Sequence, residues 1–151
     1  MKRIISLILA LSMIFSLGIT AFADVTYSAD KSSIKTNETV SVTISNGEKM
    51  EDITAFEYRL YFDSELFELK SYEIGTANAL VQITSVAKTD SKGTYYGISL
   101  VDATSEGLEV AEGVIATLVF EAIKEVDTAS DANFELVKKS VMDTSFTEIE
   151  A

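Results

Sequence analysis

The chain has 151 residues, with 24 acidic and 12 basic residues and a net charge of −12, and it contains no histidine, cysteine or proline. Without histidine and cysteine there is no imidazole base, no thiol nucleophile and no ordinary zinc site, and a Ser-His-Asp triad cannot be built. The acidic balance also excludes the basic footprint that binding to nucleic acid or to an anionic membrane requires.

The first residues have the pattern of a secretory signal peptide. Lys2 and Arg3 form a short cationic start. An apolar stretch from Ile4 to about Leu17 follows, and Ala21-Phe22-Ala23 supplies a small-x-small cleavage site. An uncleaved membrane anchor is the alternative, but the cleavage site favours removal of residues 1–23. We therefore expect a secreted, extracellular domain without membrane association.

The mature chain would be a single domain of residues 24–151. Loss of Lys2 and Arg3 removes two positive charges and no acidic ones, which changes the net charge from −12 to −14. A chain of this length can bury a sizeable core, so packing alone can stabilise it without disulfides. We expect it to be monomeric when alone.

Alternating side chains predict strands in the first half of this domain. Thr39–Ser45 alternates apolar and polar residues with period two and ends at the turn signal Asn46-Gly47. The alternation returns in Ile53–Phe62, and Asp63-Ser64-Glu65-Leu66 then predicts a tight turn into the next strand. Four large residues of the second stretch share the face that we expect in the core: Phe56, Tyr58, Leu60 and Phe62.

The second half contains further predicted strands, in chain order Ala79–Val86, Thr94–Val101, Val114–Phe120, Phe134–Val137 and Val141–Ile149. Asp90-Ser91-Lys92-Gly93 predicts a hairpin loop, and Asp102–Glu112 a longer acidic connection. The strand at Val114–Phe120 is apolar on both faces, which predicts that it is covered on both sides. Evenly spaced short strands predict an all-β, antiparallel β-sandwich.

Carboxylates suggest two kinds of site, both with a simpler explanation. Glu57 and Asp102 are candidates for a paired-carboxylate enzyme, and Asp63, Glu65 and Glu68 for a calcium site. A chain with 24 acidic residues produces such groups by accident, and turn formation and solvation account for the second one. We therefore expect no catalytic activity, no cofactor and no metal.

A carbohydrate-binding face would need exposed aromatic rings, because sugar rings stack their C–H faces on π surfaces. The chain has no tryptophan, and alternation turns two of its tyrosines, Tyr58 and Tyr96, toward the core. The other four are scattered along the sequence: Tyr27, Tyr61, Tyr72 and Tyr95. The sequence pattern neither supports nor excludes an exposed aromatic strip.

Three stretches stand in an order typical of one protein family: Thr39–Asn46, Ile53–Leu66 and Glu112–Phe120. The first resembles the second strand of cohesin domains. The second is similar to their aromatic strand, which an aromatic-Asp pair follows, and the third to the Gly-x-hydrophobic-Ala-x-hydrophobic strand near the end of the module. The resemblance covers residues 24–151. Two features depart from it, since Ser64 stands where cohesins usually have proline, and the final strand is short.

This resemblance implies a nine-stranded jelly-roll sandwich that binds the dockerin of a secreted polysaccharide-degrading enzyme. Such binding docks the enzyme into a scaffoldin assembly, the cellulosome, with calcium carried by the dockerin. In cohesins, outward residues of the third and sixth strands contribute to the receptor face. Carried over position by position, the predicted partner-binding residues are Ala55, Glu57 and Arg59, with Gly97, Ser99, Val101 and Asp102. Cohesins often have Asn and Asp where Ala55 and Glu57 stand here.

The residues themselves are consistent with such a face. Ala, Gly and Ser outward on neighbouring strands predict a flat surface that a helical partner can approach, and Glu57 and Asp102 could receive its Lys or Arg. The alternative is that these residues only solvate the sheet. A protein receptor is the leading hypothesis, with a carbohydrate-binding module of related fold or a structural, adhesive surface domain as the alternatives.

Overall fold

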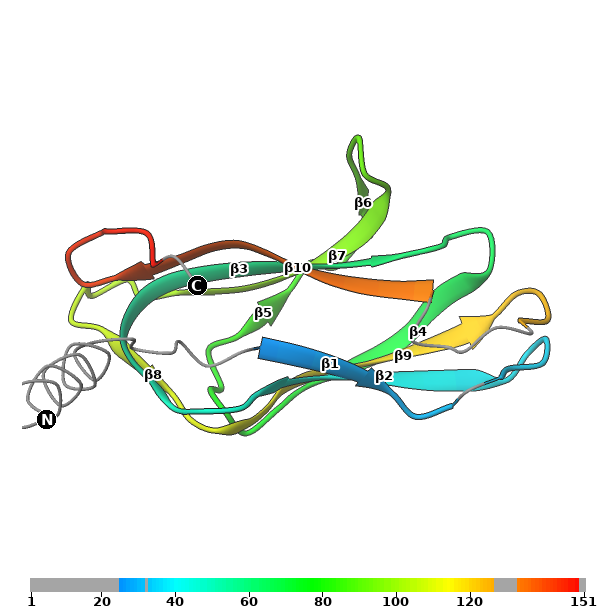
Figure 1. Cartoon of the computed structure of the whole chain (residues 1–151), viewed down its shortest axis with the longest axis horizontal. Coiled ribbons are helices and arrows are strands. Elements are labelled where there is room, and N and C mark those ends of the chain that lie inside the picture. The colour runs from blue at the N-terminus through cyan, green and yellow to red at the C-terminus, as the bar shows by residue number, and fades with distance from the viewer. Residues whose placement is uncertain (1–24, 32, 127–132, 150–151) are drawn as a thin grey trace, which may run out of the picture.

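The computed structural model describes residues 25–31, 33–126 and 133–149 (Figure 1). The signal peptide predicted over residues 1–23 lies outside the described residues, so its boundary stays a prediction. None of the described residues belongs to a helix that is long and apolar enough to cross a membrane.

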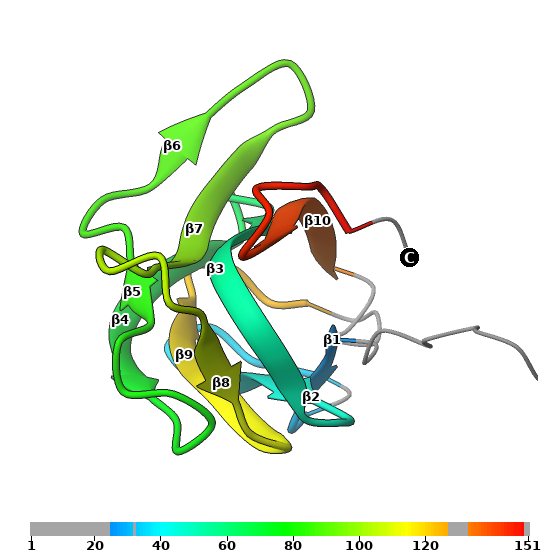
Figure 2. The same cartoon turned by 90° about the vertical axis from the view of Figure 1, so that its left-hand side faces the viewer.

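Within these ranges the chain forms ten strands, which are β1 (Val25–Ala29), β2 (Thr39–Asn46), β3 (Met50–Phe62), β4 (Phe67–Ile74), β5 (Gln82–Ile83), β6 (Lys88–Thr89), β7 (Thr94–Val101), β8 (Leu108–Val110), β9 (Gly113–Ala122) and β10 (Phe134–Asp143). One sheet has the order β1-β2-β9-β4 and the other the order β10-β3-β7-β5, with β6 paired to β7 and β8 paired to β3. All pairings are antiparallel. The two sheets lie in separate layers (Figures 1 and 2), which confirms the predicted all-β sandwich.

The long strand β3 organises the second sheet. It pairs with β10 along one edge and with β7 along the other, and its first residues also pair with β8. Its alternation turns one set of side chains inward, and these are all buried: Phe56, Tyr58, Leu60 and Phe62. The core face predicted for this strand is therefore confirmed.

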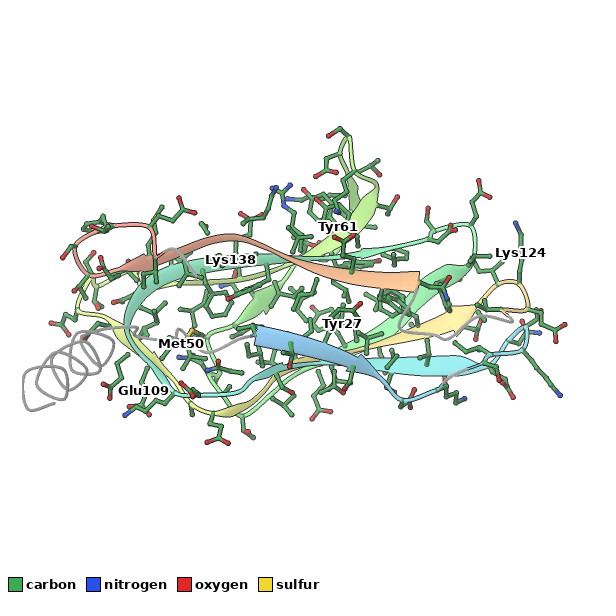
Figure 3. All side chains as sticks on the ribbon, in the orientation of Figure 1. Tyr27, Met50, Tyr61, Glu109, Lys124 and Lys138 are labelled. Atoms are coloured by element: carbon green, nitrogen blue, oxygen red, sulfur yellow. The ribbon has the colours of Figure 1, made fainter. Side chains whose placement is uncertain are left out.

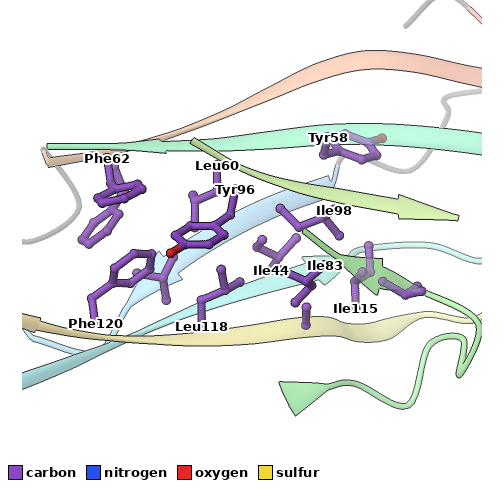
Figure 4. Packing of buried hydrophobic residues seen from close by; sticks show 14 of the residues in the cluster. Ile44, Tyr58, Leu60, Phe62, Ile83, Tyr96, Ile98, Ile115, Leu118 and Phe120 are labelled. Carbon is purple, nitrogen blue, oxygen red and sulfur yellow. The ribbon is translucent and has the colours of Figure 1, made fainter. Parts of the chain in front are cut away.

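Aromatic rings join the two sheets at one end of the core (Figure 4). Phe120 of β9 is fully buried, and its ring centroid lies 5.1 Å from that of Phe62 and 5.0 Å from that of Phe134. Tyr96 stacks on Phe62 with a centroid distance of 5.6 Å. Because these rings come from both sheets, their packing holds the layers together.

The segment predicted as one strand over Ala79–Val86 is mostly not a strand. Within this segment only β5 pairs with another strand, and the next short strand, β6, begins beyond it at Lys88. Asn78 explains the start of the segment, because its side-chain oxygen accepts a hydrogen bond from Leu80 N at 2.8 Å and so folds a local turn. The segment Asp102–Glu112, predicted as a longer acidic connection, contains the short strand β8.

Two further predictions about strands need correction. The strand β9 was predicted to be covered on both sides. Its outward residues Thr117 and Val119 are only half-buried, so β9 is fully covered only on its core side.

Of the two weak strands predicted near the end, Phe134–Val137 and only the first residues of Val141–Ile149 belong to the single strand β10, which ends at Asp143. The pairing of β10 with β3 shifts register between Lys138 and Ser140. This irregularity breaks the alternation, which is why the sequence pattern predicts two strands here.

Replacing Phe120 by alanine tests the role of the aromatic packing. We expect the Phe120→Ala variant to lose about 3–5 kcal/mol of unfolding free energy in urea denaturation, because a buried ring shared by both sheets leaves a cavity. The control is Tyr72→Ala on β4, whose side chain is 46% exposed. A loss at Phe120 no greater than that at Tyr72 would contradict this account.

Candidate partner-binding face

The predicted residues of β3 and β7 are direct cross-strand neighbours. They form three pairs in the register of the two strands: Ala55 with Val101, Glu57 with Ser99, and Arg59 with Gly97. Since alternate residues of a strand share one side, these positions all lie opposite the core on the outer surface of the second sheet. We call this surface the β3–β7 face. The structure thus brings six of the predicted residues together, while their role in binding stays a prediction.

Arg59 is the centre of a polar network on this face. Its Nε donates to Glu57 Oε1 at 2.8 Å, and its Nη1 donates to Asp90 Oδ2 at 2.9 Å. Its guanidinium carbon lies 4.5 Å from the centroid of the Tyr95 ring, a cation–π contact. The hydrogen bond with Glu57 raises the pKa of Arg59 above its ordinary value. The guanidinium is therefore held in one place by three neighbours.

Asp90 ties a projecting hairpin to this network. The hairpin arm, residues 85–94, contains β6 and rises from the sheet (Figures 1 and 2). Asp90 Oδ1 accepts hydrogen bonds from the amides of Lys92 and Gly93, while Oδ2 accepts from Arg59 and from the hydroxyl of Tyr61 at 2.7 Å. Figure 3 shows Tyr61 at the foot of the arm. One carboxylate thus shapes the turn and also fastens it to β3.

The hydrogen bond from Tyr61 is the largest cause that lowers the pKa of Asp90 below its ordinary value of 3.8. Burial raises the pKa of Tyr61, so the phenol keeps its proton and acts as the donor. Lys92 adds an ion pair to Glu135 of β10 at 2.8 Å. The charges of Arg59, Asp90 and Lys92 are therefore already paired within the domain.

Gly97 does not form the exposed flat patch that the sequence suggested. Thr84 lies over it, with Thr84 N donating to Gly97 O and Gly97 N donating to Thr84 Oγ1, each at 3.0 Å. A Cβ atom on Gly97 would lie 3.2 Å from Thr84 Cγ2, so the glycine permits this close approach. The neighbouring surface is a hollow of about 270 Å³, lined by Glu57, Arg59, Thr84, Lys88, Tyr95, Gly97 and Ser99.

Asp102 is also used differently from the expectation. Its Oδ1 accepts hydrogen bonds from Thr104 N and Thr104 Oγ1, and its Oδ2 accepts from Gly107 N at 2.8 Å. The Thr104 hydroxyl is the largest cause that lowers the pKa of Asp102 below its ordinary value. Because both oxygens hold its own loop, the interpretation of Asp102 as a carboxylate open to a partner's cation does not fit this geometry. Glu57, with 40% of its side chain exposed, remains accessible.

The scattered tyrosines do not form an exposed aromatic strip. Tyr61 and Tyr95 are buried on the β3–β7 face beneath Lys92 and Arg59. Tyr72 is exposed, but it belongs to β4 of the other sheet. Tyr27 is half-buried, and its hydroxyl donates to Phe134 O at 2.5 Å between the layers (Figure 3).

Two of the three acidic groups considered for calcium, Asp63 and Glu68, have structural partners. Asp63 Oδ1 accepts a hydrogen bond from Glu65 N at 2.8 Å, which confirms the tight turn predicted there. Glu68 forms an ion pair with Lys70 at 3.7 Å. In the described part of the chain, no three acidic residues are arranged to hold a metal ion.

Sequence reasoning missed the importance of Asp90 and Tyr61 for this face. The hairpin loop around Asp90 was predicted, and Asp followed by Gly three residues later is a usual turn signal. That signal reveals the turn but not the contact with Arg59, because the contact joins segments 31 residues apart.

A change of pH tests the fastening of the arm. We expect the Asp90→Asn variant to unfold at lower urea than the wild type at pH 7, because it loses the charge-assisted hydrogen bonds. Since the folded pKa of Asp90 is depressed, the wild-type advantage should persist above pH 3.8 and shrink as pH falls through the folded value. Ser91→Ala in the same turn is the control. A stability gap independent of pH would contradict the assignment.

Known proteins resemble this chain in fold. A type II cohesin from Acetivibrio cellulolyticus matches with a TM-score of 0.58 at 12% identity, over 85% of this chain and 88% of that chain. The sixth cohesin of scaffoldin B from the same organism, in complex with a dockerin variant, matches with a TM-score of 0.57 at 17% identity. The match covers 84% of this chain and 92% of that chain. A non-cellulosomal cohesin from the archaeon Archaeoglobus fulgidus matches with a TM-score of 0.56 at 13% identity, over 85% of this chain and 84% of that chain.

No curated protein sequence matches the chain. The family model for the cohesin domain matches residues 25–151, which is nearly the whole domain expected after signal cleavage. The match includes both strands of the β3–β7 face as well as the β9 strand. The chain therefore belongs to the cohesin family.

Proposed function

We propose that this domain is a non-catalytic receptor that binds a dockerin through its β3–β7 face. The observation that carries the proposal is the register of β3 and β7, which joins Ala55, Glu57 and Arg59 to Val101, Ser99 and Gly97 on one outer surface. Membership of the cohesin family supports the kind of partner. A similar cohesin from scaffoldin B of Acetivibrio cellulolyticus is in complex with a dockerin, which is consistent with the same use here.

The chemistry of the face suits a protein partner. Small side chains at Ala55 and Ser99 allow close approach of another backbone, and Val101 is 70% exposed beside them. At the other end, Arg59 and Glu57 are held in place by their mutual ion pair before any partner arrives. Groups that are already ordered lose little conformational entropy on binding, so they favour recognition.

The wider role proposed here rests on the predicted signal peptide and on the resemblance to cohesins. The mature domain would act outside the cell, monomeric when alone, and bind dockerin-bearing secreted enzymes that degrade polysaccharides. Calcium would reside on the dockerin. A direct carbohydrate-binding role has less support, because Tyr61 and Tyr95 are buried instead of forming a stacking surface.

A capture experiment tests this proposal. The purified mature domain is immobilised and exposed to the secreted proteins of its source organism, with calcium or with a chelator. We expect dockerin-bearing enzymes to be recovered only with calcium. Binding of the domain to insoluble polysaccharide with no dockerin recovered would instead favour a carbohydrate-binding module, and binding to neither would favour a structural or adhesive domain.

A matched pair of substitutions tests the face. Ser99 and Thr117 are half-buried hydroxyl residues on the outer sides of the two opposite sheets. We expect Ser99→Arg to weaken dockerin binding by about tenfold or more in calorimetric titration, because the long side chain blocks close approach. Thr117→Arg adds the same charge and should leave affinity unchanged. Equal effects of the two substitutions would contradict the proposed surface.

A further inference from the structure

An apolar hollow lies at one end of the β3–β7 face. It encloses about 440 Å³ between the segment before β5 and the loop after β7. Apolar side chains supply most of its lining: Ala79, Leu80, Val81, Val101, Ala103 and Leu108. Its remaining members are Gln82, Asp102 and Thr104.

Two large apolar side chains of this hollow face solvent. Val101 is 70% exposed and Leu80 is 56% exposed, whereas most large apolar residues of the domain are buried. Single exposed apolar residues are ordinary, but two that line the same concave site form a surface whose removal from water is favourable. The hollow is thus suited to receive an apolar group.

Both walls of the hollow are fixed by hydrogen bonds. Asn78 accepts a hydrogen bond from Leu80 N and donates through its Nδ2 to Glu109 O, each at 2.8 Å, which ties one wall to β8. Asp102 holds the other wall through Thr104 and Gly107. The hollow therefore exists before a partner binds, so its walls lose little conformational entropy when a partner binds.

The hollow is continuous with the proposed receptor surface. Val101 lines it and is also the cross-strand partner of Ala55. From this point the face becomes increasingly polar toward the arm, because Glu57, Arg59 and Asp90 follow. A partner that covers Ala55 and Ser99 would also lie against Val101.

We infer that this hollow receives an apolar side chain of the dockerin, and that Leu80, Val101 and Leu108 determine which dockerins are accepted. The inference rests on the proposed function and deepens it. A cationic side chain is a poorer occupant, because both Asp102 oxygens are already bonded within the loop. Cationic side chains of the partner instead meet Glu57 at the polar end of the face.

The test uses a dockerin-bearing enzyme recovered in the calcium-dependent capture. Its affinity for the purified protein is measured by calorimetric titration with the wild type and with the double variant Leu80→Ser, Val101→Ser. The matched control is the double variant Tyr72→Ser, Ile123→Ser, whose original side chains are 46% and 47% exposed and lie outside the hollow. Thermal unfolding of each variant reports whether the fold is retained.

We expect the hollow variant to weaken binding by about tenfold or more and the control to bind like the wild type. Leu80→Met, which keeps an apolar side chain, should retain most of the affinity. If the hollow variant binds as tightly as the wild type, or if the control loses as much affinity, the inference is overturned while dockerin binding stands. If the wild type binds no dockerin, the proposed function itself fails, and the inference fails with it.

Discussion

The alternation of side chains from Ala55 to Phe62 of β3 is the constraint on which the rest of the structure depends. Its inward residues pack against the opposite sheet, and its outward residues Glu57 and Arg59 occupy the β3–β7 face. A register shift of one residue would place these charges in the core and expose the aromatic rings, so the strand can pack in only one way. The core and the candidate receptor surface are therefore the two sides of one strand.

The ends of the face are fixed by short polar side chains that work within the domain. Asp90 fastens the arm at one end, while Asn78 and Asp102 hold the walls of the hollow at the other. Asp90 and Asn78 each close their own turn and also bond a distant segment, whereas the Asp102 side chain bonds only its own loop. Part of the acidic character of the chain therefore has a structural role. The carboxylates of Asp90 and Asp102 accept hydrogen bonds from donors within the domain and are not available to a partner.

The result is a surface with two chemically different ends and small side chains between them. The cohesins with the same fold are only 12–17% identical to this chain, so the shared architecture does not require shared surface residues. Ala55 and Glu57 stand where many cohesins carry Asn and Asp, which removes one amide from the centre of the face. Specificity in this domain would then depend more on the arm network and on the hollow beside Val101.

By itself, the sequence determined which way the side chains of β3 and β7 face, because period-two alternation assigns each residue to one side of a strand. It also determined the turns at Asp63 and Asp90, whose short side chains bond nearby amides, and the family. Only the tertiary structure decided what covers each outward residue. Gly97 is buried because Thr84 returns to it from another segment. Likewise, Ala79–Val86 is mostly unpaired although its local pattern favours a strand, since a ladder requires a neighbouring strand that lies within reach.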